Sequence, residues 1–498
     1  MYSRKLKFRL AWLVMMLTGI SMFTGAQITL TIEKALEIAE ENNPQMQMSK
    51  LSFERTQFLL EAQRASLKSQ FSMTVDPFAY SQRRSFDTRF SEWYTSKSLM
   101  SSGTFRVVQS IPFTDGEIML SNTFGWQDSE STKQNETNKN KAFQNNLSVR
   151  LNQPLFTYNR RKMEMQQLEF NNENAGISYS LQRLRTEQSI NNQFYAVYMA
   201  QNSLEISQVE LENAKKDYEI IKEKVNAELS AKEELFQAEV NLSNAESSVE
   251  SSNVNLQNAK DNLKQTLGMQ LSEDINVSAD IQVSTMAIDP ATAIQSGLAS
   301  RMELRQREID MDLEELTMIT IKARNEFRGE LSLAVGITGD DPTFGKIYSN
   351  PTQSPSVSIN FNIPIFDWGE KKARVRAQQS AQTIAKLRYD NEKVNIELEI
   401  RQTLRELENN RNQIRIVETQ IRNAELTYDL NQIRYREGEL TGLQMSQYQS
   451  QLSSAKTKLV SAQINYKTTL LNLKILTLYD FENDKPLVPI KDYLKLNK

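Results

Sequence analysis

Pairs of carboxylates are the residues of this 498-residue chain with the clearest chemical potential, because the chain has neither His nor Cys. Such pairs can act as general acid and base, or bind a divalent cation. Glu40-Glu41 and Glu314-Glu315 fall in helical patterns, which favours solvated helix faces, and Asp340-Asp341 lies in a predicted polar loop. The two missing residue types exclude a Ser–His–Asp triad, thiol nucleophiles and zinc–thiolate sites. We therefore predict a protein that is not an enzyme and has no cofactor or metal, with carboxylate-based hydrolysis left as an alternative.

The composition narrows the class of protein further. Lys and Arg (59) nearly balance Asp and Glu (62), which argues against a nucleic-acid-binding protein. Gly (15) and Pro (11) are scarce, as expected where long helices dominate. Basic residues between Arg4 and Arg9 precede an apolar run from Leu10 to Phe23 and the small residues Thr24-Gly25-Ala26. This order predicts a secretory signal peptide over residues 1–26.

The elements of the chain are arranged in an internal duplication. Residues 154–268 reappear at 364–478, a shift of 364 − 154 = 210. The helical patterns at 31–69 and 290–328 match at a shift of 293 − 35 = 258, so the first copy carries 258 − 210 = 48 additional residues. We predict the following organisation: repeat 1 at 27–270, a linker at 271–289, repeat 2 at 290–481 and a C-terminal tail at 482–498.

Four stretches alternate apolar and polar residues with a period of two, which predicts strands with one apolar and one polar face. They centre on 71–75, 147–151, 331–337 and 357–363. Polar loops at 128–142 and 339–354 would join the two strands of each copy. Within the additional residues, a Thr114-Asp115-Gly116 turn predicts a hairpin over 102–127, which either extends the strands or caps one end.

Very long helices are predicted after both Pro motifs. Apolar residues recur at spacings of three and four over 404–428 and 452–473, a pattern typical of coiled coils. A continuous helix from Arg160 to Ala227 would be roughly 100 Å long. Breaks at 226–230 and 437–441 predict hairpin turns, with Gly438 as a C-cap and Ser230 or Thr441 as the next N-cap. The shift of 211 between those two N-caps indicates a one-residue insertion.

These strands and helices favour an oligomeric conduit. About 9–11 residues of strand cross a bilayer, but four strands are too few to close a useful β-barrel. Several copies would therefore contribute four strands each to one barrel, and their long helices would form one tube. Pro154 and Pro364 stand where each strand gives way to a helix, where a missing backbone N–H is tolerated.

The chain resembles the TolC-like outer membrane efflux protein family. The resemblance rests on the duplication and on the motifs Gln153-Pro154-Leu155-Phe156, Pro364-Ile365-Phe366-Asp367-Trp368-Gly369 and Tyr435-x-x-Gly438-x-x-Thr441. It implies a mainly α chain with a membrane β-barrel, assembled as a homotrimer with a 12-strand barrel and a periplasmic α-helical tunnel. It also implies a passive export duct in outer membrane lipid. Its helical tips would dock onto a periplasmic adaptor (membrane fusion) protein and an inner-membrane transporter.

The resemblance also implies two groups of site residues. Family aspartates that narrow the periplasmic opening align with Gln444 and Gln447, so a constriction here would depend on amides rather than carboxylates. Glu233 and Glu234 are the first-copy candidates, with solvated charges as the alternative. The adaptor-docking candidates are the tip residues Ala227, Glu228, Leu229, Ser230, Gly438, Glu439, Leu440 and Thr441. The alternative function is a periplasmic or secreted coiled-coil structural or adaptor protein, although an adaptor would have one helical hairpin instead of two.

Overall fold

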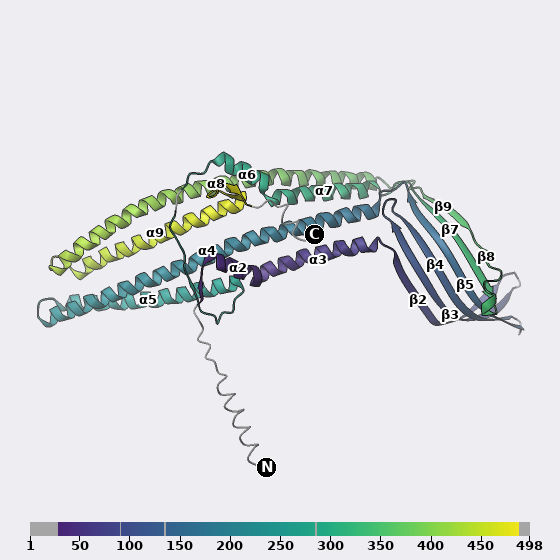
Figure 1. Ribbon diagram of the computed structural model, residues 1–498, viewed down its shortest axis with the longest axis horizontal. Helices are drawn as coiled ribbons and strands as arrows, with labels where there is room; N and C mark the ends of the chain where they lie inside the picture. Colours follow the sequence, from purple (N-terminus) through teal and green to yellow (C-terminus); the bar gives the residue numbers. More distant parts are fainter. Residues whose placement is uncertain (1–27, 90, 134–135, 284–285, 488–498) are drawn as a thin grey trace, which may run out of the picture. The chain divides into compact units, whose positions relative to one another are not determined.

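The structure is a computed structural model that describes residues 28–89, 91–133, 136–283 and 286–487 (Figure 1). The predicted signal peptide (1–26) and the last part of the predicted tail (488–498) lie outside the described residues. The chain divides into two compact units. The first comprises the described residues of Met1–Leu51, Ser178–Met302 and Lys393–Lys498, and the second comprises those of Ser52–Ile177 and Glu303–Glu392.

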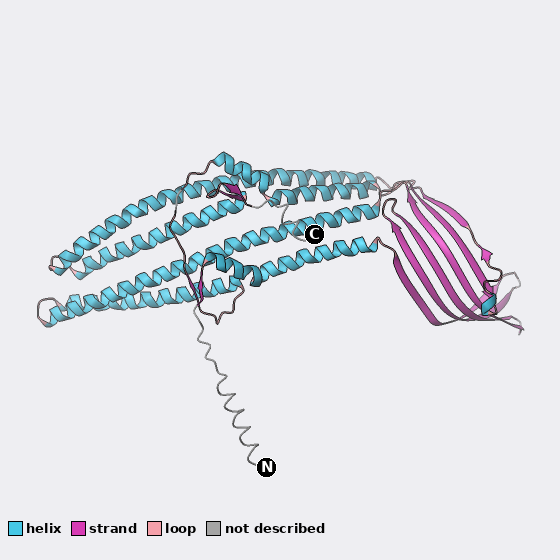
Figure 2. Ribbon diagram, in the orientation of Figure 1, coloured by secondary structure: helices cyan, strands magenta, loops and turns pink. Residues whose placement is uncertain are grey.

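The second unit contains one antiparallel sheet (Figure 2). Its strands are β2 (Gln70–Asp87), β3 (Glu92–Ile111), β4 (Gly116–Lys133), β5 (Glu136–Leu155), β7 (Arg328–Asp341), β8 (Thr352–Gln353) and β9 (Ser356–Asn362). The first five lie in the order β2-β3-β4-β5-β7, and β8 and β9 both pair with β7.

The four predicted strands are found in β2, β5, β7 and β9, and the predicted hairpin adds β3 and β4, so the expected count of four strands per chain is too low for the described part of the chain. The segment 102–127 forms much of β3 and β4, which lie between β2 and β5 within the sheet. The predicted loop at 128–142 is also wrong, because β4 continues to Lys133 and β5 begins at Glu136. Both faces of the sheet are polar there, and a period of two in hydrophobicity is then invisible.

The period of two that predicted the strands is confirmed by their pairing. Leu151 is opposite Leu333 and Val149 is opposite Val335, while Ser148 lies opposite Gly336. We call the side of the sheet that carries Val149 and Val335 the apolar face, and the side that carries Ser148 the polar face. The apolar face is solvent-exposed within the chain, with 63% of Val335 and 71% of Met73 accessible.

The long helices of the two repeats match residue for residue in length. Helices α4 (Arg160–Asn226) and α8 (Glu370–Arg436) have 67 residues each, and α5 (Lys232–Leu267) and α9 (Gly442–Thr477) have 36 each. Both pairs begin at the same shift, since 370 − 160 = 210 and 442 − 232 = 210. The predicted one-residue insertion between the tips is therefore wrong, because one shift holds across both turns.

Shorter helices precede each strand region. They are α2 (Ile32–Asn42), α3 (Pro44–Ser66), α6 (Pro290–Ser300) and α7 (Met302–Lys322). Asn43 explains the break between the first two: its amide donates to the Thr266 carbonyl oxygen at 2.6 Å, and its side-chain oxygen accepts from the Met46 backbone N–H at 2.9 Å. The helical pattern over 31–69 is therefore broken at Asn43, whose side chain fixes the end of α2 against α5.

The first unit has a core where its helices meet a small parallel pair, β1 (Ile28–Leu30) and β6 (Ile275–Val277). Its fully buried members are mainly aliphatic and include Leu30, Ile190, Phe194, Val197, Leu263 and Leu267. A short antiparallel pair, β10 (Tyr479–Asp480) and β11 (Lys485–Pro486), follows α9. Gly268 ends α5 with φ of 74°, and a Cβ there would come within 2.2 Å of the Asn42 carbonyl oxygen. Only glycine satisfies both constraints.

Candidate functional site at the helical tips

The two hairpin turns have the same backbone geometry. In the second copy, the Gly438 N–H donates to the Tyr435 carbonyl oxygen (3.1 Å) and the Glu439 N–H donates to the Arg434 carbonyl oxygen (2.9 Å). Glu228 and Leu229 repeat both bonds, at 3.1 and 2.8 Å. This is the Schellman arrangement, in which one residue adopts a left-handed conformation. That residue is Gly438 (φ 80°) in one tip and Glu228 (φ 60°) in the other.

The returning helices begin differently. Thr441 is the N-cap of α9 and forms a capping box with Gln444, whose side-chain oxygen accepts from the Thr441 N–H at 3.0 Å. In the first copy the N-cap is Ala231, which has no side-chain acceptor. The expectation that Thr441 is an N-cap is confirmed, and the expectation for Ser230 is wrong. The Ser230 hydroxyl instead donates to the Glu234 carboxylate.

The constriction candidates all lie in the first two turns of α5 or α9 and are all exposed: Gln444, Gln447, Glu233 and Glu234. The capping box occupies the side-chain oxygen of Gln444, which gives this residue a local structural role. Gln447 lies beyond the cap on the same helix. Glu233 and Glu234 stand in the first turn of α5, where negative charge is stabilised by the helix dipole.

The docking candidates form two exposed loops. Ala227, Glu228, Gly438, Glu439 and Thr441 are exposed, whereas Ser230 and Leu440 are half-buried. Leu229 stands out, because 79% of this apolar side chain is accessible. An exposed leucine at the end of a hairpin is typical of a surface that contacts another molecule when it is part of a larger apolar patch. Leu443 (53% exposed) and Phe236 (62% exposed) are further exposed apolar side chains near the two turns.

A cleft of about 470 Å³ lies beside the tips, lined by residues of α4, α5 and α9. Burial in its wall raises the pKa of Asp217 above its ordinary value. Burial, followed by the nearby charges of Asp217 and Glu234, raises the pKa of Tyr435 to about 12. The Tyr435 hydroxyl is buried without a hydrogen-bond partner among the described residues, and the Lys224 ammonium lies 5.9 Å from the ring centroid.

Asp217, which lines this cleft, and Tyr435, which lies beside its lining residue Gly442, were not among the predicted site residues. Tyr435 belongs to the tip motif, so its position was visible in the sequence, but its burial was not. Asp217 carries no sequence signal, because it is one of many acidic residues on a long polar helix.

The described helices include none whose length and apolarity together suffice for crossing a lipid bilayer. Within the described residues, there is also no group of three or more His, Cys, Asp or Glu side chains placed to hold a metal ion.

Comparison with known proteins shows which solved structures share this fold. Residues 293–477 match the family model described as outer membrane efflux protein. The chain is also similar to solved outer membrane channels. CmeC of Campylobacter jejuni has 15% identity and a TM-score of 0.69, covering 93% of this chain and 88% of that one. MtrE of Neisseria gonorrhoeae, in its open state, has 14% identity and a TM-score of 0.65, covering 90% and 88%. No curated protein matches the sequence.

The chain has the TolC-like fold, and its residues 293–477 match the outer membrane efflux protein family. The predicted family resemblance, the mainly helical fold with long helices and antiparallel strands, and the outer membrane location agree with these matches. Proteins of that family are transport channels and not enzymes, in agreement with the prediction for this chain. The match spans the second repeat, and the first repeat shares its helix lengths.

Proposed function

We propose that three copies of this efflux protein form a passive export duct through the outer membrane and the periplasm. The helical tips would dock onto a periplasmic adaptor, and an inner-membrane transporter would supply the energy. The observation that carries this proposal is the pair of helical hairpins, identical in length and in turn geometry, that the duplication produces. Two equivalent hairpins per chain allow three chains to present six similar tips around one axis.

Two features favour the duct over a coiled-coil structural or adaptor protein. An adaptor is expected to have a single helical hairpin, and this chain has two. A purely structural coiled coil has no need for a sheet with one apolar and one polar face, which suits a boundary between lipid and water. Solvent-exposed leucine at a tip also favours docking onto a partner.

Gln447 provides the test, because it is exposed beyond the capping box and its replacement leaves the cap intact. The chain contains no Cys, so Gln447→Cys creates a single thiol. If second-copy tips converge on a central opening, a short bifunctional thiol reagent should crosslink Gln447→Cys chains and reduce export. A reductant-cleavable reagent should make both effects reversible.

Gln237→Cys is the matched control, since Gln237 occupies the equivalent position of the first repeat, on α5. It lines the cleft within one chain and should crosslink poorly between chains. Equal crosslinking at both positions, or full export through a quantitatively crosslinked Gln447→Cys channel, would remove the second-copy tips from the opening.

A further inference from the structure

We propose that each chain contributes six strands to the membrane, so that three copies close a sheet of eighteen strands and not twelve. This inference rests on the proposed trimer. It concerns the β3–β4 hairpin, which accounts for most of the additional residues that the first repeat holds beyond the second.

The hairpin is built like a lipid-facing element. On β4 the apolar face presents Ile118, Leu120, Phe124 and Trp126, and the neighbouring β5 presents Leu151, Val149, Leu147 and Phe143. The stretch from Ile118 to Trp126 matches the roughly 9–11 residues that a tilted strand needs to cross a bilayer. Asn122 and Asn145, on diagonal positions, are the polar members of this band on the two strands.

Charged residues mark where the apolar band stops. Beyond Trp126 the same face carries Asp128, which pairs with Lys141 at 3.1 Å. Glu130 follows, and it contacts Lys97 of β3 at 3.7 Å and Lys139 of β5 at 3.4 Å. The change from apolar to charged residues occurs at nearly the same level on β3, β4 and β5. A common boundary across three strands is expected if all three cross one apolar layer and emerge into water together.

The opposite face of the hairpin is polar, in agreement with a water-filled interior. It carries Ser121, Thr123 and Gln127 on β4, and the Thr104 and Thr123 hydroxyls lie 3.0 Å apart across β3 and β4. The hairpin thus continues both faces of the sheet in phase with β2 and β5. A hairpin that capped one end would have no reason to preserve this phase.

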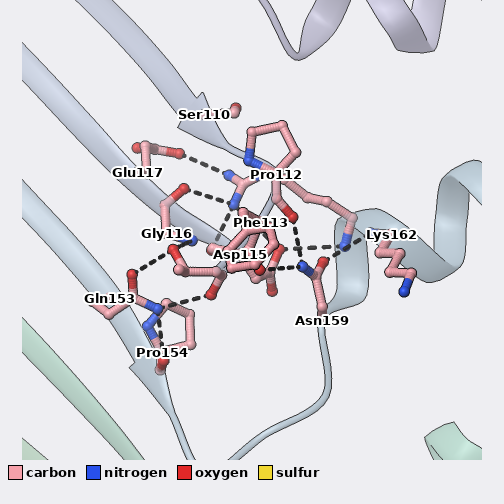
Figure 3. A network of polar contacts seen from close by, with 12 residues as sticks. Ser110, Pro112, Phe113, Asp115, Gly116, Glu117, Gln153, Pro154, Asn159 and Lys162 are labelled. Atoms are coloured by element: carbon pink, nitrogen blue, oxygen red, sulfur yellow. Dashed lines mark hydrogen bonds and ion pairs between the residues drawn. The ribbon is translucent and has the colours of Figure 1, made fainter.

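The turn of the hairpin is also fixed to the start of α4 (Figure 3). The Arg161 guanidinium donates to the Asp115 carboxylate (3.2 Å), to Glu117 (3.2 Å) and to the carbonyl oxygens of Asp115 and Gly116. The Asn159 amide donates to the carbonyl oxygens of Pro112 and Phe113. Asp115 is 6% exposed and the Arg161 side chain 16%. The hairpin is therefore held along both long sides and at its turn.

The outer edges of the sheet are those of β2 and β9. Neither edge is paired with another strand among the described residues. An unpaired edge in a membrane leaves backbone groups without partners, so another copy must cover it. Six antiparallel strands make β9 run opposite to β2, and β9 of one copy can therefore pair antiparallel with β2 of the next.

We obtain the register of this pairing by aligning the end of β9 that precedes α8 with the start of β2 that follows α3. Full use of β9 places Asn362 opposite Gln70 and Ser356 opposite Asp76, and it brings Ile359 opposite Met73 on the apolar face. Within one chain, a row of paired residues joins Gln70 to Ser356 through Val108, Met119, Arg150 and Ala334. Because the proposed register places Ser356 opposite Asp76 of the next copy, the row that starts at Gln70 meets the next β2 six residues further along. The row therefore shifts by six residues for every six strands.

This shift of six residues per six strands corresponds to a strand tilt within the range found in closed β-sheets. Six residues are about 20 Å along a strand and six strands are about 29 Å across, which corresponds to a tilt of about 35°. Closed sheets have tilts of about 35–45°. At this tilt eighteen strands enclose a diameter of about 33 Å between backbones, against about 22 Å for twelve. After allowance for side chains, the opening is about twice as wide.

Paired cysteines test the register. Ser358 and Thr74 lie on the polar face of β9 and β2, and the proposed register puts them directly opposite, at about 4.5–5.5 Å between Cα atoms. In the Cys-free chain, Ser358→Cys with Thr74→Cys should form disulfides between chains in high yield. Ser358→Cys with Ser72→Cys or Asp76→Cys, one pair off register, should form at least fivefold less. A higher yield for either control overturns the register.

Imaging of single particles of the full chain then counts the strands. A three-fold particle with eighteen strands and disulfides between Ser358→Cys and Thr74→Cys supports the proposal. A three-fold particle with twelve strands and the β3–β4 hairpin outside the closed sheet overturns it, while the proposed duct stands. A particle without three-fold symmetry overturns the proposed duct as well.

Discussion

Arg161 offers the sharpest test of how the additional hairpin is held. Arg161→Ala leaves the Asp115 carboxylate without its counter-charge at a site that is 6% exposed, and it removes donors from two backbone carbonyl oxygens. Removal of one partner from a buried ion pair costs about 3–5 kcal/mol. The free energy of local opening at the β3–β4 turn should therefore fall by about 3 kcal/mol, and amide hydrogen exchange in the turn should accelerate more than a hundredfold.

The duplication supplies the control for this experiment. Lys371 occupies the position of Arg161 in the second repeat and contacts Glu326 at 2.7 Å, with side chains 30% and 45% exposed. An exposed pair contributes about 0–1 kcal/mol, so Lys371→Ala should change exchange at the start of β7 less than tenfold. Asp115→Asn combined with Arg161→Met should recover part of the lost protection, because no uncompensated charge remains. Equal acceleration in Arg161→Ala and Lys371→Ala would refute the reasoning.

Two further predictions concern the tips. Gly438→Ala should destabilise its turn by about 1 kcal/mol, and Glu228→Gly should stabilise the equivalent turn by a similar amount, because a left-handed conformation favours glycine. Hydrogen exchange at the two turns measures both changes, and effects of the same sign would contradict this reasoning. Burial raises the pKa of Asp217, so its contribution to stability is present at acid pH and is lost as pH rises above its unfolded value of about 3.9. Asp217→Asn should therefore raise the denaturation midpoint at pH 7 and lose this advantage below pH of about 4, whereas an advantage that is independent of pH would exclude titration as the cause.

The helices were predictable because their pattern repeats in one chain. The constant shift between the two repeats is visible in the sequence, and the structure confirms it at every boundary of the four long helices. The sheet was predictable only where one face is apolar, as at 147–151 and 331–337. The ends of β4 and β5 were missed because charged and hydroxyl residues there occupy both faces. Strand pairing at those ends depends on partners such as Lys141 opposite Asp128, which no local pattern identifies.

At the tips, too, the features set by local sequence were predictable, whereas those set by tertiary contacts were not. Gly438 and the Thr441-x-x-Gln444 spacing are local, and both have the capping geometry that residues of these types favour. Glu228 adopts the same left-handed conformation without a sequence signal, because the matching helix lengths impose the turn. The raised pKa of Asp217 depends on burial by neighbouring helices, so it could not be read from the sequence.

The difference between Arg161 and Lys371 indicates how the first repeat adapted to its additional strands. In the second repeat a lysine is sufficient, because its ammonium meets one carboxylate, Glu326, on a partly exposed surface. In the first repeat the hairpin turn presents two carboxylates and two carbonyl oxygens to the same position. The planar guanidinium can satisfy such a set from a fixed orientation, whereas an ammonium acts as a single point of charge. Arg161→Lys should therefore protect the turn less than arginine although the charge is kept. The hairpin is thus an integral part of the first repeat, as the proposed six strands per chain require.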